Sequence, residues 1–228
     1  MKTLRLMRVL LQASIALMPW MLKRRLLQWI FGYELDPTAR IGLSWIYPRH
    51  LQMASETRID SFTVAIHLDR IAMEEHATIG RGNWITGFPS GSCSSHFAHQ
   101  AARRPELHLE AHASITKNHH IDCTDRVRIG AFTTIAGYRS QLLTHSIDLQ
   151  LCRQHSAPIQ IGAYCFVGSN CVILGGSVLP DQCVLGALSL LNKPQREPLS
   201  LYAGQPARRV KAINPKAAYF SRRRGHVV

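Results

Sequence analysis

The sequence predicts an all-β solenoid, a parallel β-helix, with a helical segment at each end. An aliphatic residue recurs at every sixth position in the C-terminal half, at Ile161, Val167, Ile173, Leu179, Leu185 and Leu191. A small residue follows four positions after each of the first five, at Cys165, Cys171, Ser177, Cys183 and Ser189. A period of six fits neither an alternating strand nor a 3.6-residue helix. Three short strands per coil would instead stack each aliphatic side chain into an inward column.

The same period is present upstream but is interrupted. Ile115 and Ile121 keep it, and it then slips by two residues to Ile129 and Ile135. Two segments leave the repeat altogether, residues 87–106 and 141–158. Excursions from a solenoid lie on its outside, where function concentrates. We therefore divide the chain into an amphipathic helical segment (1–37), a β-helix (38–192) and a basic, helical C-terminal extension (193–228).

The basic residues lie mainly at the two ends of the chain. The 228 residues are 46% hydrophobic, enough for one core, and carry a formal net charge of +13. Residues 1–31 hold six basic side chains and no acid, and residues 193–228 hold nine against one. This placement favours an anionic lipid surface or a phosphorylated ligand over a nucleic-acid partner, for which no motif is present. Basic ends that serve solubility alone are the alternative.

The N-terminal segment is apolar but short. The run from 9 to 22 has too few residues to span a bilayer as a helix, which takes about 20. Lys23, Arg24 and Arg25 follow it directly, and no small-residue cleavage site does, which disfavours a signal peptide. Trp20 and Trp29 beside these basic residues predict an interfacial helix in peripheral contact with an anionic membrane, at its cytoplasmic face. A helix that caps the β-helix is the equal alternative.

Cysteines and histidines could suggest disulfides or a metal. Cys165, Cys171 and Cys183 fall on the six-residue register, and none of the six cysteines forms a CxxC pair, which predicts reduced structural thiols. The adjacent His119 and His120 would point to opposite faces of a strand, and no three histidines have the separation that a metal site needs. We expect no metal.

The first excursion carries two histidines and two arginines, His96, His99, Arg103 and Arg104. Loops that leave a rigid scaffold often hold binding residues. We therefore predict that these side chains contact the substrate that accepts a transferred group or, alternatively, only add polarity to the loop.

His145 is the candidate catalytic residue. It lies in the second excursion, directly before the most regular coils. A neutral imidazole can take a proton from a hydroxyl or an amine as that group attacks a carbonyl. Asp148, three residues on, would orient the imidazole or cap a turn.

Five short motifs carry a resemblance to a known family. They are residues 144–148 (THSID), 158–162 (PIQIG), 166–170 (FVGSN), 191–193 (LNK) and 204–207 (GQPA). In order and spacing, this set resembles the galactoside and maltose O-acetyltransferases, a hexapeptide-repeat acyltransferase family. The likeness covers roughly residues 115–213. The whole chain is also similar to acyltransferases of polysaccharide-biosynthesis clusters.

The resemblance implies a left-handed β-helix, a homotrimer with active sites between subunits, and acetyl-CoA as donor. It implies that His145 is the general base, that Asn118 assists it, and that the backbone amide of Ser169 donates to the thioester oxygen. The residues that would line the CoA groove are Gly168, Ser169, Ala187, Lys193 and Arg208.

The sequence also departs from that family. The aspartate that contacts the sugar falls near Cys123, so we take the neighbouring Asp122 and Asp125 as candidate acceptor contacts. Phe166 stands at the family's tryptophan position and Ser146 at its proline position. Residues 87–106 have no counterpart in the small-sugar enzymes, which indicates a different acceptor.

We therefore predict an acetyl-CoA-dependent O-acetyltransferase that modifies a hydroxyl of a sugar or surface-glycan precursor. The acceptor would attack the thioester directly, in keeping with the lack of a GxSxG or Cys/His nucleophile signature. An N-acyltransferase for a nucleotide-linked amino sugar is a second hypothesis, because one base serves both acceptors. A non-catalytic or metal-binding β-helix scaffold is a third.

Overall fold

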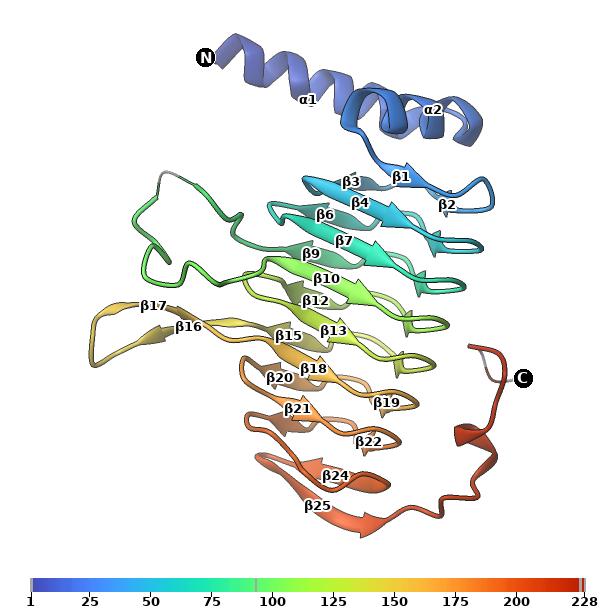
Figure 1. Cartoon of the computed structure of the whole chain (residues 1–228), viewed down its shortest axis with the longest axis vertical. Helices are drawn as coiled ribbons and strands as arrows, with labels where there is room; N and C mark the ends of the chain where they lie inside the picture. The colour runs from blue at the N-terminus through green and yellow to red at the C-terminus, as the bar shows by residue number, and fades with distance from the viewer. Residues whose placement is uncertain (1, 93, 226, 228) are drawn as a thin grey trace.

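The chain folds as a left-handed parallel β-helix with two helices at its N-terminal end, as predicted (Figure 1). The computed structural model describes residues 2–92, 94–225 and 227, with side chains from residue 6 onward. Three parallel sheets form the faces of a triangular prism, and the chain passes through sheets A, B and C in turn. We call the edges between them the A–B, B–C and C–A corners.

Each sheet adds one strand per coil. Sheet A contains β1 (Glu34–Leu35), β4 (His50–Met53), β7 (Arg70–Met73), β10 (Glu106–Leu109), β13 (Val127–Ile129), β18 (Ile159–Ile161) and β21 (Val178–Leu179). Sheet B contains β2 (Arg40–Ile41), β5 (Arg58–Ile59), β8 (Thr78–Ile79), β11 (Ser114–Ile115), β14 (Thr134–Ile135), β19 (Phe166–Val167), β22 (Val184–Leu185), β24 (Ser200–Gly204) and β25 (Ala207–Ala212). Sheet C contains β3 (Trp45–Tyr47), β6 (Val64–Ile66), β9 (Trp84–Thr86), β12 (His120–Asp122), β15 (Gln141–Leu143), β20 (Val172–Leu174) and β23 (Leu190–Leu191).

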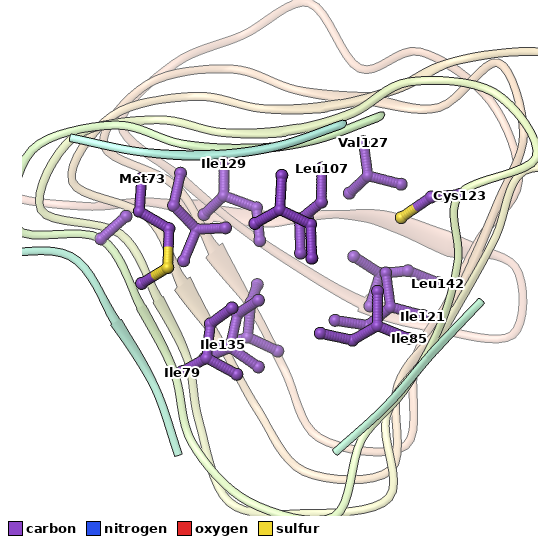
Figure 2. Packing of buried hydrophobic residues seen from close by; sticks show 14 of the residues in the cluster. Met73, Ile79, Ile85, Leu107, Ile121, Cys123, Val127, Ile129, Ile135 and Leu142 are labelled. Atoms are coloured by element: carbon purple, nitrogen blue, oxygen red, sulfur yellow. The ribbon is translucent and has the colours of Figure 1, made fainter. Parts of the chain in front are cut away.

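The predicted six-residue register is confirmed by the core. All six aliphatic residues from Ile161 to Leu191 are buried, as are the five small residues that follow them. Figure 2 shows the same inward packing in the upstream coils, with Ile79 and Ile135 close together on one side of the prism. The two-residue slip of the period arises because β13 in sheet A is longer and points two residues inward, Val127 and Ile129. The repeat therefore continues through it.

Both excursions leave the prism at the C–A corner, two coils apart (Figure 1). The first connects β9 to β10, as predicted. The second is shorter than predicted, because residues 141–143 form β15 and Leu142 is buried in the core. It is an antiparallel hairpin of β16 (His145–Asp148) and β17 (Arg153–Ser156), so His145 lies on a strand and not on a loop.

The helices cover the N-terminal end of the solenoid. Ile15 of α1 (Lys2–Leu17) and Leu27 of α2 (Trp20–Phe31) are fully buried and belong to the same core as the coils. Gly32 ends α2 in the left-handed conformation, with φ of 66°, which glycine adopts without strain. Lys23, Arg24 and Arg25 do not form one continuous basic surface, because Lys23 is buried. Its Nζ donates to the carbonyl of Gly42 at 2.7 Å, and burial lowers its pKa to about 8.

The prediction that the C-terminal extension is helical is wrong. Residues 200–212 form the antiparallel pair β24–β25, which extends sheet B. Among the described residues that follow, the only helical element is a single 3₁₀ turn, η1 (Ala218–Phe220). The outer edge of β22 presents backbone N–H and C=O groups that need hydrogen-bond partners. β24 pairs with this edge in parallel and so supplies them. The solenoid also begins slightly earlier than predicted, with β1 at 34–35.

A buried histidine makes the stability of this fold depend on pH. His119 is 2% exposed at the B–C corner, where the Ser140 amide donates to its Nδ1 at 3.2 Å. The neutral tautomer therefore carries its proton on Nε2, which lies 3.0 Å from the hydroxyl oxygen of Thr116. Burial lowers the pKa of His119 to about 4 from its usual 6.5. His119 therefore stays neutral in the folded state at pH values at which it is protonated in the unfolded chain.

We expect the free energy of unfolding to decrease as the pH falls below 6.5, by about 2 kcal/mol at pH 5 from this residue. Chemical denaturation at pH 7 and pH 5 measures the difference. His119→Gln should be less stable at pH 7 but should lose much less between the two pH values. The exposed neighbour, varied as His120→Gln, is the control and should behave like the wild type. Equal pH dependence in all three proteins would contradict the assignment.

Candidate active site

His145 and Asp122 form a hydrogen-bonded pair where sheet C ends at the C–A corner. The His145 Nδ1 lies 3.3 Å from the Asp122 Oδ2, and the His145 amide donates to the same oxygen at 3.0 Å. The parallel register of β12 and β15 brings them together, because it sets Asp122 opposite Leu143, two residues before His145. Asp122 therefore contacts the candidate base directly, whereas the sequence suggested a contact with the acceptor.

The surroundings of Asp122 fix the direction of this interaction. Its side chain is 9% exposed, and its Oδ1 accepts from both the amide and the hydroxyl of Thr124, at 3.0 and 2.6 Å. The Thr144 hydroxyl lies 3.1 Å from Oδ2. A carboxylate can only accept here, so the Nδ1 of His145 carries a proton. The Nε2 of a neutral imidazole is then free to take a proton, and the His145 side chain is 47% exposed.

The first excursion walls one side of His145. The ring of Phe97 meets the imidazole edge to face, with centroids 6.2 Å apart, and is itself 6% exposed. The Arg103 guanidinium lies 4.7 Å from the centre of the Phe97 ring and donates to the carbonyl of Thr124 at 2.6 Å. Arg103 thus braces this wall, whereas the sequence suggested an acceptor contact. Sequence reasoning missed Phe97, for which the available signal was the pair of phenylalanines, Phe88 and Phe97, in a mostly polar excursion.

The two excursions are also joined to each other. The side-chain amide of Gln100 pairs with the backbone of Ser156 on β17, at 2.8 Å and 2.9 Å. Asp125 accepts from the Arg104 amide and from the Ser156 hydroxyl, at 3.3 Å each, and has no hydrogen bond to His145. The first excursion thereby shapes the space beside the hairpin. Asp125 therefore links the first excursion to β17 of the hairpin.

The two candidate histidines of the first excursion lie further out. His96 is exposed and meets the Phe88 ring edge to face at 5.9 Å, while His99 is exposed without an aromatic partner among the described residues. Neither hydrogen bonds to the pair of His145 and Asp122.

Three of the CoA candidates stack on the B–C corner, at the other edge of sheet C. Gly168 lies directly beneath Ala187, so that an added Cβ would fall 2.6 Å from its nitrogen. The amides of Gly168 and Asn170 are bonded, but no described residue accepts from the amide of Ser169 between them. Arg208 is exposed on β25 beside this corner, opposite Ala203. The corner therefore offers small residues and a free N–H donor.

The remaining two candidates, Asn118 and Lys193, lie at different corners of the prism. Asn118 is exposed at the B–C corner, where its φ of 56° places it in the left-handed turn before β12. Lys193 is exposed just after β23, at the C–A corner. The candidate residues thus fall on the two opposite edges of sheet C, and one chain does not bring His145 together with Asn118 or Ser169.

The described cysteines form no disulfide, and the possible metal ligands do not cluster. In the described part of the chain, the five cysteines are free thiols, and burial raises the pKa of Cys165 to about 12. Cys93 lies outside the described residues. Over the same residues, no group of three His, Cys, Asp or Glu side chains could hold a metal ion.

We expect Asp122→Asn to lower kcat by between about tenfold and 10⁴-fold, because the amide cannot hold the His145 tautomer as a carboxylate does. KM for the acyl donor should change little. Steady-state kinetics with a thioester donor test this split. Asp60→Asn makes the same chemical change just after β5, at an aspartate that pairs with Arg58 away from this site, and should keep near-normal kcat. A pure KM effect, or equal losses in both variants, would contradict a positioning role for Asp122.

Comparison with known proteins supports the architecture. No protein-family model and no curated protein matches this sequence. A solved structure of the hexapeptide-repeat-containing acetyltransferase VCA0836 from Vibrio cholerae superposes with a TM-score of 0.50 and 21% identity, covering 62% of this chain and 73% of that one. A mutant of AntD, an N-acyltransferase from Bacillus cereus solved with dTDP and coenzyme A, superposes with a TM-score of 0.52 and 14% identity, covering 87% and 92%. This chain therefore shares the left-handed β-helix of the hexapeptide-repeat acyltransferases.

Proposed function

We propose that this protein is an acetyl-CoA-dependent O-acetyltransferase that modifies a hydroxyl of a sugar or a surface-glycan precursor. The observation that carries the proposal is the ordered pair of Asp122 and His145, which leaves an exposed Nε2 free to accept a proton. VCA0836, whose fold the chain shares, has also been solved with acetyl-CoA bound, in a structure that superposes with a TM-score of 0.50.

The proposed reaction is a direct transfer. The acceptor oxygen attacks the thioester carbonyl as the Nε2 of His145 takes the hydroxyl proton. The Ser169 N–H, which no described residue uses, would donate to the oxygen that becomes negatively charged. The carbon–sulfur bond then breaks, and the imidazolium returns its proton to the sulfur, releasing CoA thiol and the acetyl ester. This route needs no covalent enzyme intermediate.

A homotrimer would complete the site. The pair of Asp122 and His145 lies at the C–A corner and the Ser169 amide at the B–C corner, so a neighbouring copy must supply one of them. The outer face of sheet C is apolar toward both ends, with Trp84 50% exposed and Val172 and Leu190 half-buried, and its middle strands place His120 and Gln141 in the same row. Sheet A instead carries charged rows. In a closed ring, the B–C corner of each subunit meets the C–A corner of the next.

An amino group is the second candidate acceptor. It is supported by the shared fold with AntD, whose structure holds dTDP and coenzyme A. A nucleotide-linked amino sugar would use the same base, because an amine also loses a proton as it is acylated.

The direct test is release of free thiol from acetyl-CoA by the purified protein, with sugars, glycan precursors and nucleotide-linked amino sugars as acceptors. Mass spectrometry of the product distinguishes an ester from an amide, and sedimentation velocity measures the oligomeric state. No acceptor-dependent thiol release from a folded protein would favour the scaffold hypothesis. A monomer with full activity would contradict the shared site.

We also propose that α1 and α2 hold the enzyme on an anionic membrane. Neither helix, over its described residues, has the length and apolar character to cross a bilayer. Yet Leu17 is 74% exposed and Trp29 is 83% exposed, in a segment that carries Arg8, Arg24 and Arg25 and no acid. An apolar surface flanked by arginines suits the interface of an anionic bilayer.

Substitution is a better test of this proposal than deletion, because α2 also covers the core. The pair Leu17→Ser and Trp29→Ser should weaken binding to phosphatidylserine vesicles by about tenfold or more, since each buried apolar side chain contributes about 1.5–3 kcal/mol. Cosedimentation measures this. The pair Leu149→Ser and Leu151→Ser removes exposed apolar groups from the hairpin tip instead and should bind normally. Equal binding by both variants, or none by the wild type, would contradict the proposal.

A further inference from the structure

The C-terminal segment lies across the outer face of sheet B and encloses a groove that the proposed chemistry does not use. After β25, the chain turns back along the A–B corner, against the direction of the coils (Figure 1). The Tyr219 hydroxyl donates to the carbonyl of Cys165 at 3.1 Å, and Gly225 packs against His112 further up. We call residues 213–225 the strap.

An aromatic column fastens the strap. The rings of His76, His112, Phe132 and Tyr164 stack in successive coils, with centroids 4.5 to 4.7 Å apart. This spacing matches the distance between paired strands. The Arg222 guanidinium lies 3.8 Å from the Tyr219 ring and 5.5 Å from the Tyr164 ring, and it donates to the carbonyl of Phe132. Several such contacts together hold the strap in one position.

The next two arginines of the strap are free of such contacts. Arg223 and Arg224 are exposed, line the groove, and form no ion pair with any described residue. The groove has a volume of about 810 Å³, within the range of small-molecule sites. One carboxylate, Glu56, also lines it. Two unpaired guanidinium groups in a groove are suited to phosphate, which arginine binds in bidentate fashion.

The floor and the end wall of the groove add to this character. Hydroxyl groups of sheet B form the floor, among them Thr78 and Ser114, which hydrogen bond to each other at 2.8 Å. Phe166 and Tyr219 meet edge to face at 6.3 Å and provide aromatic surface. Arginines, hydroxyls and aromatic rings together fit a nucleotide, with its phosphates, sugar and base, better than a wholly apolar ligand or a cation.

The groove is continuous with the corner that we propose for the acyl donor. Phe166, in the groove, is two residues before Gly168, and Thr116, also in the groove, is two residues before Asn118. A long ligand could therefore lie with one end in the groove and the other at the B–C corner. CoA has this form, with a phosphorylated nucleotide at one end and the thioester at the other.

We propose that the groove between the strap and sheet B binds the phosphorylated nucleotide of a substrate, with Arg223 and Arg224 as its phosphate ligands. The continuity with the B–C corner favours the nucleotide of CoA, and this part of the proposal rests on the proposed function. A nucleotide-linked acceptor carries the same chemistry, so the experiment separates the two sources.

Calorimetric titration of the full chain tests the site without any catalysis. The probes are adenosine 3′,5′-bisphosphate for CoA, dTDP for a nucleotide-linked acceptor, and adenosine as the phosphate-free control. The variant Arg223→Glu with Arg224→Glu should weaken binding of the preferred nucleotide by tenfold or more. The variant Lys211→Glu with Lys216→Glu makes the same change of charge on exposed residues outside the groove and should bind within about twofold of the wild type.

The probe that binds more tightly identifies the source. Equal weakening by both variants, no saturable binding of either nucleotide, or adenosine binding as tightly as the bisphosphate would each overturn the proposal.

Kinetics distinguish a failure of the site from a failure of the proposed function. The arginine variant should raise KM for acetyl-CoA by tenfold or more, with kcat unchanged. Transfer from acetyl-pantetheine, which lacks the nucleotide, should be unaffected. If the wild type transfers acetyl groups but this variant keeps its KM and its nucleotide binding, the site is wrong and the function stands. If no transfer occurs but nucleotide binding still needs the two arginines, the function is wrong and the site stands.

Discussion

The variant His145→Ala should remain folded and lose acetyl transfer by about two to four orders of magnitude, the usual contribution of a general base. Its side chain is 47% exposed and lies on the β16–β17 hairpin outside the solenoid, so its removal leaves no cavity in the core. Thiol release from acetyl-CoA measures the rate, and thermal denaturation measures the fold.

A second histidine on the same hairpin provides the control. His155 is exposed on β17, opposite Ser146, and has no hydrogen bond to Asp122 among the described residues. We expect His155→Ala to keep near-normal turnover. If folded His145→Ala turned over at the wild-type rate, the mechanism would be wrong, and Asp122 would need another explanation.

The second large effect concerns folding. Cys171 is fully buried at the B–C corner, with its Sγ donating to the carbonyl of Gly186 at 3.1 Å. Burial raises the pKa of this thiol, as expected for a group that water does not reach. Cys171→Arg would place an unpaired charge in the core at a cost of several kcal/mol, against a typical total stability of about 5–15 kcal/mol. We expect no soluble folded protein.

Cys171→Ala tests the same position without the charge and should cost only about 1 kcal/mol. Cys152→Arg makes the identical change at an exposed cysteine of the hairpin and should express normally. Soluble protein with a cooperative unfolding transition from Cys171→Arg would be incompatible with the inward position that the structure gives this residue.

The repeat made the fold predictable, because its cause is local and recurs. Every inward aliphatic residue from Ile161 to Leu191 follows from one period and one requirement, burial in a shared core. The departures arise where a strand is longer. Sheet A strands such as β13 bury two residues, and the sequence shows this only as a slip of the period.

The candidate site was predictable residue by residue but not as an arrangement. His145 could be proposed from its setting, whereas its partner Asp122 is 23 positions away and is brought close only by the register of β12 with β15. That register depends on the number of residues in the intervening coil, which the period does not give. Phe97 and Arg103 reach the site through the path of the first excursion, which has no repeat to constrain it.

The C-terminal extension shows how tertiary context overrides composition. Its alanines and basic residues are typical of a helix, and its sequence alone predicts one. In the folded chain, β22 presents unpaired backbone groups, and β24 binds to them. The turn at residues 204–206 then returns the chain as β25. The hydrogen bonds offered by an existing sheet decide the outcome.

The two ends of the solenoid bear on how the protein behaves at high concentration. A stack of identical coils has an open edge at each end, and two such edges can join into a fibre. Here α2 covers the first coil with Leu27, and the last strand, β25, is antiparallel and carries Arg208, Arg209 and Lys211 on an exposed edge. Charge repulsion and the reversed strand direction both oppose the addition of another molecule in line with the axis. End-to-end joining through sheet B is thereby disfavoured, which leaves the sides of the prism, where sheet C and the candidate site lie, as the better surface for association.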